Sequence, residues 1–352
     1  MPLLLDPIRI GELDLLNRVF MSPLTRLRAT DDHVPTPIMV EYYGQRAGAG
    51  LIISEGVPVD PMGVGYRRVP GIWNEEQVEA WKPVTKAVHD AGGRIFMQLW
   101  HVGRISHPMF LNGKLPVAPS AIKPKGYVSL VRPQVEFPTP RALATDEVKQ
   151  VVEQFRRGAM NAKTAGFDGV ELHGANGYLL DQFLQDGANH RSDEYGGPVE
   201  NRARLMIECA EAAASVWGPK RVGMHLAPHS PSHDISDSDP IATFTYVFRE
   251  LGKRELGFLC VRDPLGPKHL GTAVKRAFGG VVVTNEAYTQ ESGEQVVQAN
   301  DADAVAFGKS FIANPDLPRR FAENAPLNAP VQDTFYLGGT EGYVDYPPLP
   351  ED

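Results

Sequence analysis

The stretch Val170-Glu171-Leu172-His173-Gly174-Ala175-Asn176-Gly177-Tyr178-Leu179-Leu180 gives the first indication of the fold. It opens after Gly169 as a short apolar run, which predicts a buried β-strand. A glycine-containing turn follows at once and carries three hydrogen-bonding side chains, those of His173, Asn176 and Tyr178. Clustered polar groups directly after a buried strand are typical of the catalytic end of a barrel. The alternative is a satisfied core histidine beside a surface turn, so the remainder of the chain has to decide.

Similar apolar, β-rich runs occur seven more times, and most are separated by segments with the period of a helix. The eight expected strands cover residues 18–21, 51–54, 94–99, 169–173, 221–226, 257–261, 280–284 and 302–307. Helices are expected near 75–91 behind Asn74 as N-cap, from Thr145 onwards, and near 199–217, 240–254, 289–299 and 315–323. Eight strand–helix units in one chain predict the α/β class and a TIM (β/α)8 barrel.

We expect residues 1–352 to form a single barrel domain with three additions. Residues 1–16 have the pattern of a hairpin that plugs the bottom of the barrel. Residues 102–144 form a long, proline-rich connection after the third strand, which is typical of a lid or capping loop. The alternative for this segment is a decorative surface hairpin. The tail, residues 326–352, contains Phe335, Tyr336, Tyr343 and Tyr346, and we expect it to pack over the barrel mouth or against a partner subunit.

Bulk composition narrows the class of protein. The 352 residues are 42% hydrophobic and carry a formal net charge of −8, without a conspicuous cluster of Lys and Arg. We therefore expect no nucleic-acid partner. Cys209 and Cys260 stand in apolar surroundings, as small core residues do in a reducing compartment. The N-terminus lacks the pattern of a signal peptide, and no apolar run reaches the length of a membrane span. A cytoplasmic protein without a membrane partner is expected.

The ends of the other expected strands are also polar, aromatic or glycine-rich. These ends contain Ser22-Pro23-Leu24-Thr25, Glu55-Gly56, Gln98 with Trp100 and His101, His225, Asn285-Glu286-Ala287, and Gly308-Lys309. The last two strand ends are where barrels commonly bind phosphate, and Lys309 is suited to pair with one. His173 and Asn176 offer neutral donors for a carbonyl or enone oxygen, and Tyr178 can pass a proton to the adjacent carbon. We find no metal signature and no nucleophile with a dedicated base.

At this point the chain resembles the Old Yellow Enzyme family of flavin-dependent ene-reductases along nearly its whole length. The resemblance is carried by Asn17-Arg18-Val19 through Arg26, by Gln98 to Arg104, by His173 to Leu180, by Arg191 to Gly197 with Glu200-Asn201-Arg202, by Phe311 to Leu317, and by Glu341-Gly342-Tyr343. Members of that family bind FMN, which NAD(P)H reduces. The flavin then passes a hydride to the β-carbon of an activated alkene.

The resemblance implies a role for each matching residue. Thr25 would hydrogen-bond the flavin ring, and Gln98 and Gly56 would contact its edge. The remaining cofactor contacts would come from Pro23, His225, Gly308 and Lys309. His173 and Asn176 would hold the activating oxygen of a small unsaturated substrate, and Tyr178 would protonate its α-carbon. Trp100, Tyr66 and Tyr336 would line the pocket, although plain packing is an alternative for both tyrosines. The aromatic tail suggests self-association into a homo-oligomer.

Several cofactor positions depart from the family pattern, and all lie along the expected flavin. His225 stands where the family has an Arg that faces the flavin's N1/O2 edge, and a neutral imidazole cannot replace that charge. Lys309 replaces another Arg and loses its bidentate fork. Glu286 and Ala287 stand where the family usually has Gly-Gly beside the phosphate, so a carboxylate and a methyl group intrude.

Two interpretations follow from these departures, and a third is retained from another class. The chain is an ene-reductase with weakened FMN affinity, or it is a flavin-independent isomerase or cyclase. The second type would use His173, Asn176 and Tyr178 for acid/base chemistry on an unsaturated, natural-product-like substrate. The third interpretation is a non-catalytic binding barrel.

Overall fold

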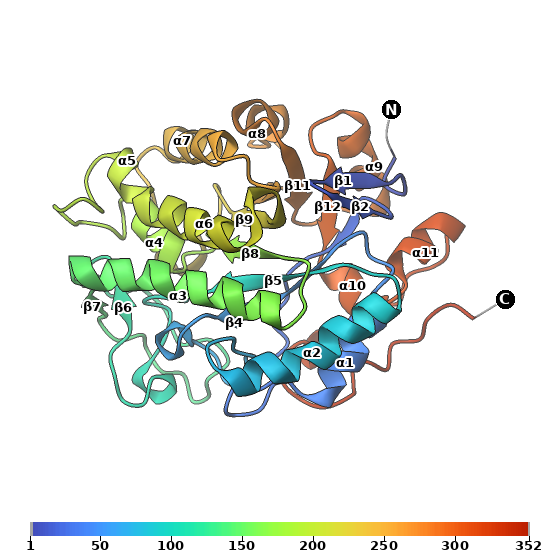
Figure 1. Ribbon diagram of the computed structural model, residues 1–352, viewed down its shortest axis with the longest axis horizontal. Coiled ribbons are helices and arrows are strands. Elements are labelled where there is room, and N and C mark those ends of the chain that lie inside the picture. Colours follow the sequence, from blue (N-terminus) through green and yellow to red (C-terminus); the bar gives the residue numbers. More distant parts are fainter. Residues whose placement is uncertain (1–2, 351–352) are drawn as a thin grey trace.

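The computed structural model describes residues 3–350 and shows a closed barrel of eight parallel strands (Figure 1). The strands are β3 (Val19–Met21), β4 (Ile52–Pro58), β5 (Ile95–Trp100), β8 (Gly169–His173), β9 (Val222–Leu226), β10 (Phe258–Arg262), β11 (Val281–Asn285) and β12 (Ala304–Phe307). They pair in chain order, and β12 closes the ring against β3. The predicted TIM barrel is therefore confirmed, with all eight strands at the expected places.

The N-terminal hairpin is also confirmed. Strands β1 (Ile8–Ile10) and β2 (Leu13–Leu15) pair antiparallel, and each turns its first and last side chains inward. Those four apolar side chains form one buried cluster with inward-facing residues of the barrel, among them Phe20, Phe96 and Phe258. The hairpin thus closes the amino-terminal end of the barrel, which leaves the carboxyl end of the strands for ligands.

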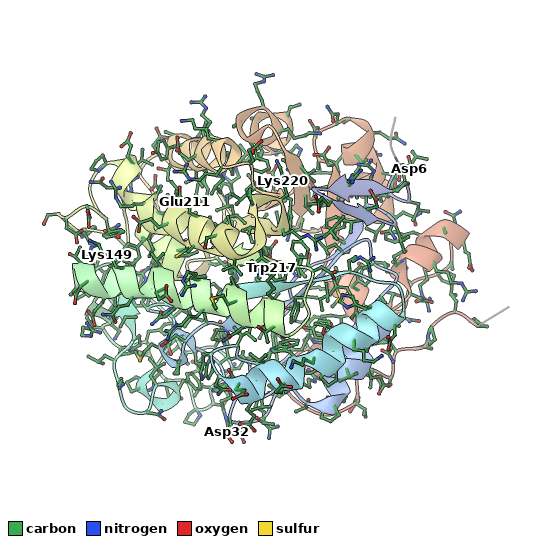
Figure 2. All side chains as sticks on the ribbon, viewed as in Figure 1. Asp6, Asp32, Lys149, Glu211, Trp217 and Lys220 are labelled. Carbon is green, nitrogen blue, oxygen red and sulfur yellow. The ribbon has the colours of Figure 1, made fainter. Side chains whose placement is uncertain are left out.

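Helices surround the barrel (Figure 1). They are α1 (Pro37–Gly44), α2 (Glu75–Asp90), α3 (Thr145–Thr164), α4 (Leu179–Leu184), α5 (Val199–Arg202), α6 (Arg204–Trp217), α7 (Pro240–Lys253), α8 (Gly271–Phe278), α9 (Gln290–Gln298), α10 (Lys309–Ala313) and α11 (Leu317–Glu323). Neighbouring helices also bond to one another. Trp217, labelled in Figure 2, ends α6. Its Nε1 donates to the carbonyl of Ala159 on α3 at 3.0 Å.

Sequence and structure agree on most helix boundaries and differ in a few places. Asn74 caps α2 as predicted, because its side chain accepts from the amide of Gln77. The helix expected over 199–217 is instead two helices, which meet at Ala203. Strand β4 does not end at Glu55-Gly56 as expected. A register shift between Ile53 and Gly56 lets the strand continue to Pro58 alongside β5.

The proline-rich connection after β5 contains a short 3-10 turn, η2 (Pro108–Phe110), and two short paired strands, β6 (Val117–Ala118) and β7 (Arg141–Ala142). Both cysteines are buried and unpaired. Within residues 3–350, no helix combines the length and the apolar character needed to cross a membrane.

Candidate active site

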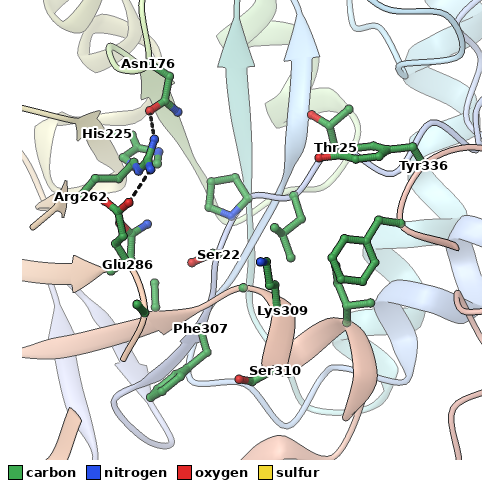
Figure 3. Close-up of a pocket in the computed structure, with 18 of the residues that line it drawn as sticks. Ser22, Thr25, Asn176, His225, Arg262, Glu286, Phe307, Lys309, Ser310 and Tyr336 are labelled. Carbon is green, nitrogen blue, oxygen red and sulfur yellow. Dashed lines mark hydrogen bonds and ion pairs between the residues drawn. The ribbon is translucent and has the colours of Figure 1, made fainter. Parts of the chain in front are cut away.

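A cavity of about 960 Å³ opens at the carboxyl end of the barrel strands (Figure 3). Its wall is built from the ends of β3, β8, β9, β10, β11 and β12, from the connection after β5, and from the C-terminal tail. The connection after β5 contributes Ser129 and Leu130, and the C-terminal tail contributes Phe335 and Tyr336. Because segments from the whole chain converge here, this cavity is the candidate active site.

Tyr178 lines the cavity directly after β8, at the start of α4. Its hydroxyl lies 2.9 Å from the hydroxyl of Tyr66, which lines the same cavity. Burial, together with the neighbouring Tyr66, raises the pKa of Tyr178 well above its usual range. The phenol therefore keeps its proton at neutral pH, which is the state that a general acid needs.

His173 ends β8 and is buried, with 7% of its surface exposed, the same as for Tyr178, although it is not among the residues that line the cavity. Its ring stacks between those of Trp100 and His225, with centroids at 5.8 and 5.4 Å, and it meets the ring of Tyr178 edge-on at 5.0 Å. Its Nδ1 is buried without a hydrogen-bond partner among the described residues. Burial, with help from the nearby His225 and Arg262, lowers the pKa of His173 well below its usual value, so the imidazole is neutral.

Asn176 lines the cavity and is held from two sides. Its backbone has a φ of +60°, which asparagine tolerates better than most residues. Its carbonyl oxygen lies 2.7 Å from Nδ1 of His233, and its side-chain Oδ1 accepts from Nη1 of Arg262 at 2.5 Å (Figure 3). Since both of its oxygens are occupied, the group that Asn176 offers to a ligand is the Nδ2 amide.

His225 lines the cavity at the end of β9, and it is neutral. Burial first, and then the Arg262 cation, lower the pKa of His225 to about 3. Gln98 donates from Nε2 to Glu171 at 2.8 Å, and the same nitrogen lies 3.2 Å from Nδ1 of His225. Nδ1 is therefore the acceptor, and Nε2 of His225 carries the hydrogen. That Nε2 is buried and has no partner among residues 3–350, so it is a donor available to a ligand.

The ends of β11 and β12 form the part of the cavity expected to hold a phosphate. Glu286 and Ala287 have φ values of +97° and +60°, the conformations that glycine adopts without strain. The Glu286 carboxylate binds Nη2 of Arg262 at 2.8 Å. Lys309 is exposed on the cavity wall, and no described residue pairs with it. The carboxylate is thus neutralised by Arg262, while the ammonium group of Lys309 remains available.

The other predicted residues divide into lining and supporting positions. Pro23, Thr25, Gly308 and Tyr336 line the cavity. Gln98, Gly56 and Trp100 lie behind the wall: Gln98 contacts His225, and a Cβ at Gly56 would meet the Trp100 ring at 2.6 Å. Trp100 in turn packs against both Tyr66 and Tyr178.

Two functional candidates were missed from the sequence. Arg262 was expected to lie just beyond its strand, but β10 includes it, in register with Asn285 of β11. It therefore reaches the barrel mouth, where it contacts Asn176 and Glu286. His233 belongs to the connection after β9, where no periodic pattern marks it, and its ring lies 5.0 Å from that of Tyr178. The sequence offered one signal for Arg262, a charged residue directly after an expected strand. It offered no such signal for His233.

Comparison with known proteins agrees with this architecture. A model of the NADH:flavin oxidoreductase / NADH oxidase family matches residues 3–328. The chain is 43% identical to putative 12-oxophytodienoate reductase 2 of Oryza sativa subsp. japonica, over 99% of this chain and 94% of that protein. It is 41% identical to a probable flavin mononucleotide-dependent alkene reductase of Leishmania infantum, over 98% of this chain and 97% of that protein.

Solved structures give the same result. Morphinone reductase in complex with tetrahydroNAD is similar with a TM-score of 0.96 and 46% identity, covering 99% of this chain and 98% of that one. The Old Yellow Enzyme homologue from Zymomonas mobilis is similar with a TM-score of 0.95 and 44% identity, covering 98% and 99%. The predicted resemblance is confirmed: the chain belongs to the NADH:flavin oxidoreductase / NADH oxidase family, which includes the Old Yellow Enzyme homologues, and is an oxidoreductase of that family.

Proposed function

We propose that this oxidoreductase reduces the activated C=C bond of a small unsaturated carbonyl compound, with NAD(P)H as reductant and FMN as cofactor. The observation that carries the proposal is the shared cavity of Asn176 and Tyr178, an amide donor and a protonated phenol, next to the positions that match the family's flavin contacts. A volume of about 960 Å³ is at the upper end of the range of ligand pockets, as a cofactor together with a substrate requires.

The residues present fit FMN, although the donor set differs from the family pattern. His225 keeps an unpartnered buried N–H at the edge of the cavity, and the neighbouring strand supplies Arg262 as a cation next to it. Lys309 is available for the phosphate, and Glu286 does not oppose it because Arg262 neutralises its charge. Thr25, Pro23 and Gly308 would complete the contacts, with Gln98 and Gly56 behind them. When bound, FMN would supply a hydride to the β-carbon of the substrate.

The protein's own residues would then supply the polar part of the reaction. Asn176, supported by His173, holds the carbonyl oxygen, so that negative charge forms there next to an N–H donor. Tyr178 transfers its proton to the α-carbon, and Tyr66 orients the phenol through the hydrogen bond between their hydroxyl groups. One hydride and one proton saturate the double bond, and NAD(P)H is oxidised to NAD(P)+.

A second candidate function is an isomerase or cyclase that uses the same cavity without flavin. It is favoured by His233, whose Nδ1 must donate to the Asn176 carbonyl, so that Nε2 is unprotonated. Burial lowers the pKa of His233, which keeps it neutral and able to accept a proton. His233 and Tyr178 thus form a base and an acid in one cavity, which is sufficient to move a double bond without redox change.

The visible absorption spectrum of the purified protein, before and after incubation with FMN and desalting, separates the two candidates. The first predicts retained yellow colour and consumption of NAD(P)H when an enone such as 2-cyclohexenone is added. A protein that remains colourless after incubation and still converts an unsaturated ketone without nicotinamide would contradict the first candidate and support the second.

A further inference from the structure

Arg262 connects Asn176 and Glu286, two residues that line the cavity. Its guanidinium donates from Nη1 to Oδ1 of Asn176 and from Nη2 to Glu286, so that one side chain spans the wall between β8 and β11 (Figure 3). Nothing in the family resemblance assigns a role to this residue. We propose that Arg262 is a positioning residue, which fixes the Asn176 amide with its N–H toward the ligand and makes the site selective for oxygens that become anionic.

The orientation follows from hydrogen-bond chemistry. A carboxamide can present either its oxygen or its NH₂ group, and an unconstrained Asn side chain exchanges them by rotation. Arginine has donors only, so the atom that meets Nη1 has to be the oxygen of Asn176. The NH₂ group is then the part that remains for a ligand, and a ligand atom that contacts it has to be an acceptor.

The charge of Arg262 adds to this orientation. A hydrogen bond from a cation to the amide oxygen polarises the amide, which makes its N–H a stronger donor. The same charge reaches other groups of the site, since it helps to lower the pKa of both His173 and His225.

Glu286 sets how much of this charge the ligand experiences. It holds Arg262 at 2.8 Å and offsets one positive charge, and its side chain is 38% exposed while that of Arg262 is 27% exposed. Removing the Glu286 charge while keeping its shape is therefore expected to strengthen the preference for an anionic oxygen. Removing Arg262 is expected to weaken that preference.

The inference rests on the proposed function, because it assumes that Asn176 contacts the ligand oxygen. It applies to both candidate reactions, since negative charge develops on the carbonyl oxygen in each. The probe is 4-nitrophenol, an oxygen ligand whose ionised form is coloured, added to the purified protein and measured as a difference spectrum against protein alone. The pH titration of this spectrum gives the apparent pKa of the bound phenol, which is independent of turnover.

The expected result is that the wild-type protein binds the phenolate preferentially and lowers the apparent pKa of the bound phenol. Arg262→Met is expected to raise that pKa by about one unit, a tenfold loss of preference. Glu286→Gln is expected to lower it further and serves as an independent test if Arg262→Met does not fold. Arg249→Met removes the same charge from an exposed position on α7 outside the cavity wall, and it should match the wild type.

The outcomes separate this inference from the proposed function. If Asn176→Ala loses the probe while Arg262→Met and Glu286→Gln titrate like the wild type, the role of Arg262 is wrong and the ligand contact of Asn176 stands. If Asn176→Ala binds the probe as the wild type does, or the wild type does not bind it, the proposed function fails as well.

Discussion

The hydroxyl oxygens of Tyr66 and Tyr178 lie 2.9 Å apart on the wall of the cavity. Tyr66 comes from the segment after β4 and Tyr178 from the turn after β8, and the Trp100 ring packs against both. Tyr66 therefore fixes the direction of the phenol that we assign as the acid. A neutral hydrogen bond of this kind contributes about 1 kcal/mol, roughly a fivefold effect on a rate that depends on it.

Tyr66→Phe should accordingly lower kcat by about five- to tenfold, with little change in KM, because it removes only the bond that orients Tyr178. Steady-state kinetics with an enone measures this effect. Tyr336→Phe is the matched control, since Tyr336 lines the same cavity but is half-exposed. Equal losses in both variants would show that the Tyr66–Tyr178 bond has no special role.

Lys309→Met should weaken binding of FMN about tenfold, or about 1.4 kcal/mol, and leave binding of riboflavin unchanged. The reason is that Lys309 is the available cation at the expected phosphate position and would not contact the ring. Quenching of flavin fluorescence in a titration measures both affinities. Lys309→Arg, which restores the bidentate fork, should bind FMN more tightly than the wild type. If the wild type, Lys309→Met and Lys309→Arg bind FMN with the same affinity, Lys309 does not contact the phosphate.

Ala287→Gly should not destabilise the fold and is expected to stabilise it slightly. Ala287 is held at a φ of +60°, which costs an L-residue roughly 1–2 kcal/mol and glycine almost nothing. This gain offsets or exceeds the greater entropy that glycine loses on folding, about 0.4–1 kcal/mol. Denaturant unfolding measures the difference. The control is Ala212→Gly inside α6, where the same replacement should cost about 1 kcal/mol. Similar losses at both positions would contradict strain at Ala287.

Glu171→Gln should make stability less dependent on pH. Burial raises the pKa of Glu171 to about 8 from an ordinary value of 4.5, and its Oε1 has no partner among the described residues. Because the folded state retains a proton that the unfolded state releases, wild-type stability falls as pH rises from about 4.5 to about 8. Above that window the loss is complete and constant.

The amide of the Gln variant does not titrate. The unfolding free energy of the variant relative to that of the wild type should therefore increase by up to about 1.4 kcal/mol per pH unit as pH rises through the window. Urea unfolding at pH 5, 7 and 9 provides the comparison. Glu250→Gln is a control on α7, where hydrogen-bonded ion pairs with Lys253 and Arg254 lower the pKa of the carboxyl group instead. A constant difference between Glu171→Gln and the wild type at all three pH values would exclude a titrating Glu171.

Most of the fold could be predicted because each barrel strand is a short apolar run between helix-period segments. Helix α1 was missed for a physical reason. Its sequence, Pro37–Gly44, includes three deeply buried side chains and only a weak apolar stripe, so no helical period appears. Helix α8 (Gly271–Phe278) was also missed, because it is short and its capping group is distant in sequence. The carboxylate of Asp263 accepts hydrogen bonds from the amides of Leu270 and Gly271 at its start.

The site was only partly predictable, because the sequence shows which residues stand at strand ends but not how their side chains pair. Arg262 illustrates this limit: its contacts with Asn176 and Glu286 depend on the register of β10 and on the two loops that follow β8 and β11. The protonation state of His225 could not be predicted from the sequence either, because burial and the Arg262 charge determine its pKa. The orientation of the His173 ring depends on its stacking between Trp100 and His225, which has no counterpart in a local sequence pattern.

The central claim is that Tyr178 delivers a proton to the carbon next to a carbonyl held by Asn176. Burial keeps the phenol protonated across the neutral range. After each transfer the phenolate regains its proton from solvent, so in D₂O the group that acts in the next turnover carries deuterium. Turnover of a prochiral α-substituted enone in D₂O, with product analysis by NMR, tests the claim most directly. The wild-type protein should place one deuterium on one face of the α-carbon, and Tyr178→Phe should lower the rate by about 10²–10⁴ and lose the facial preference. An unchanged rate and the same labelled face in Tyr178→Phe would contradict the account.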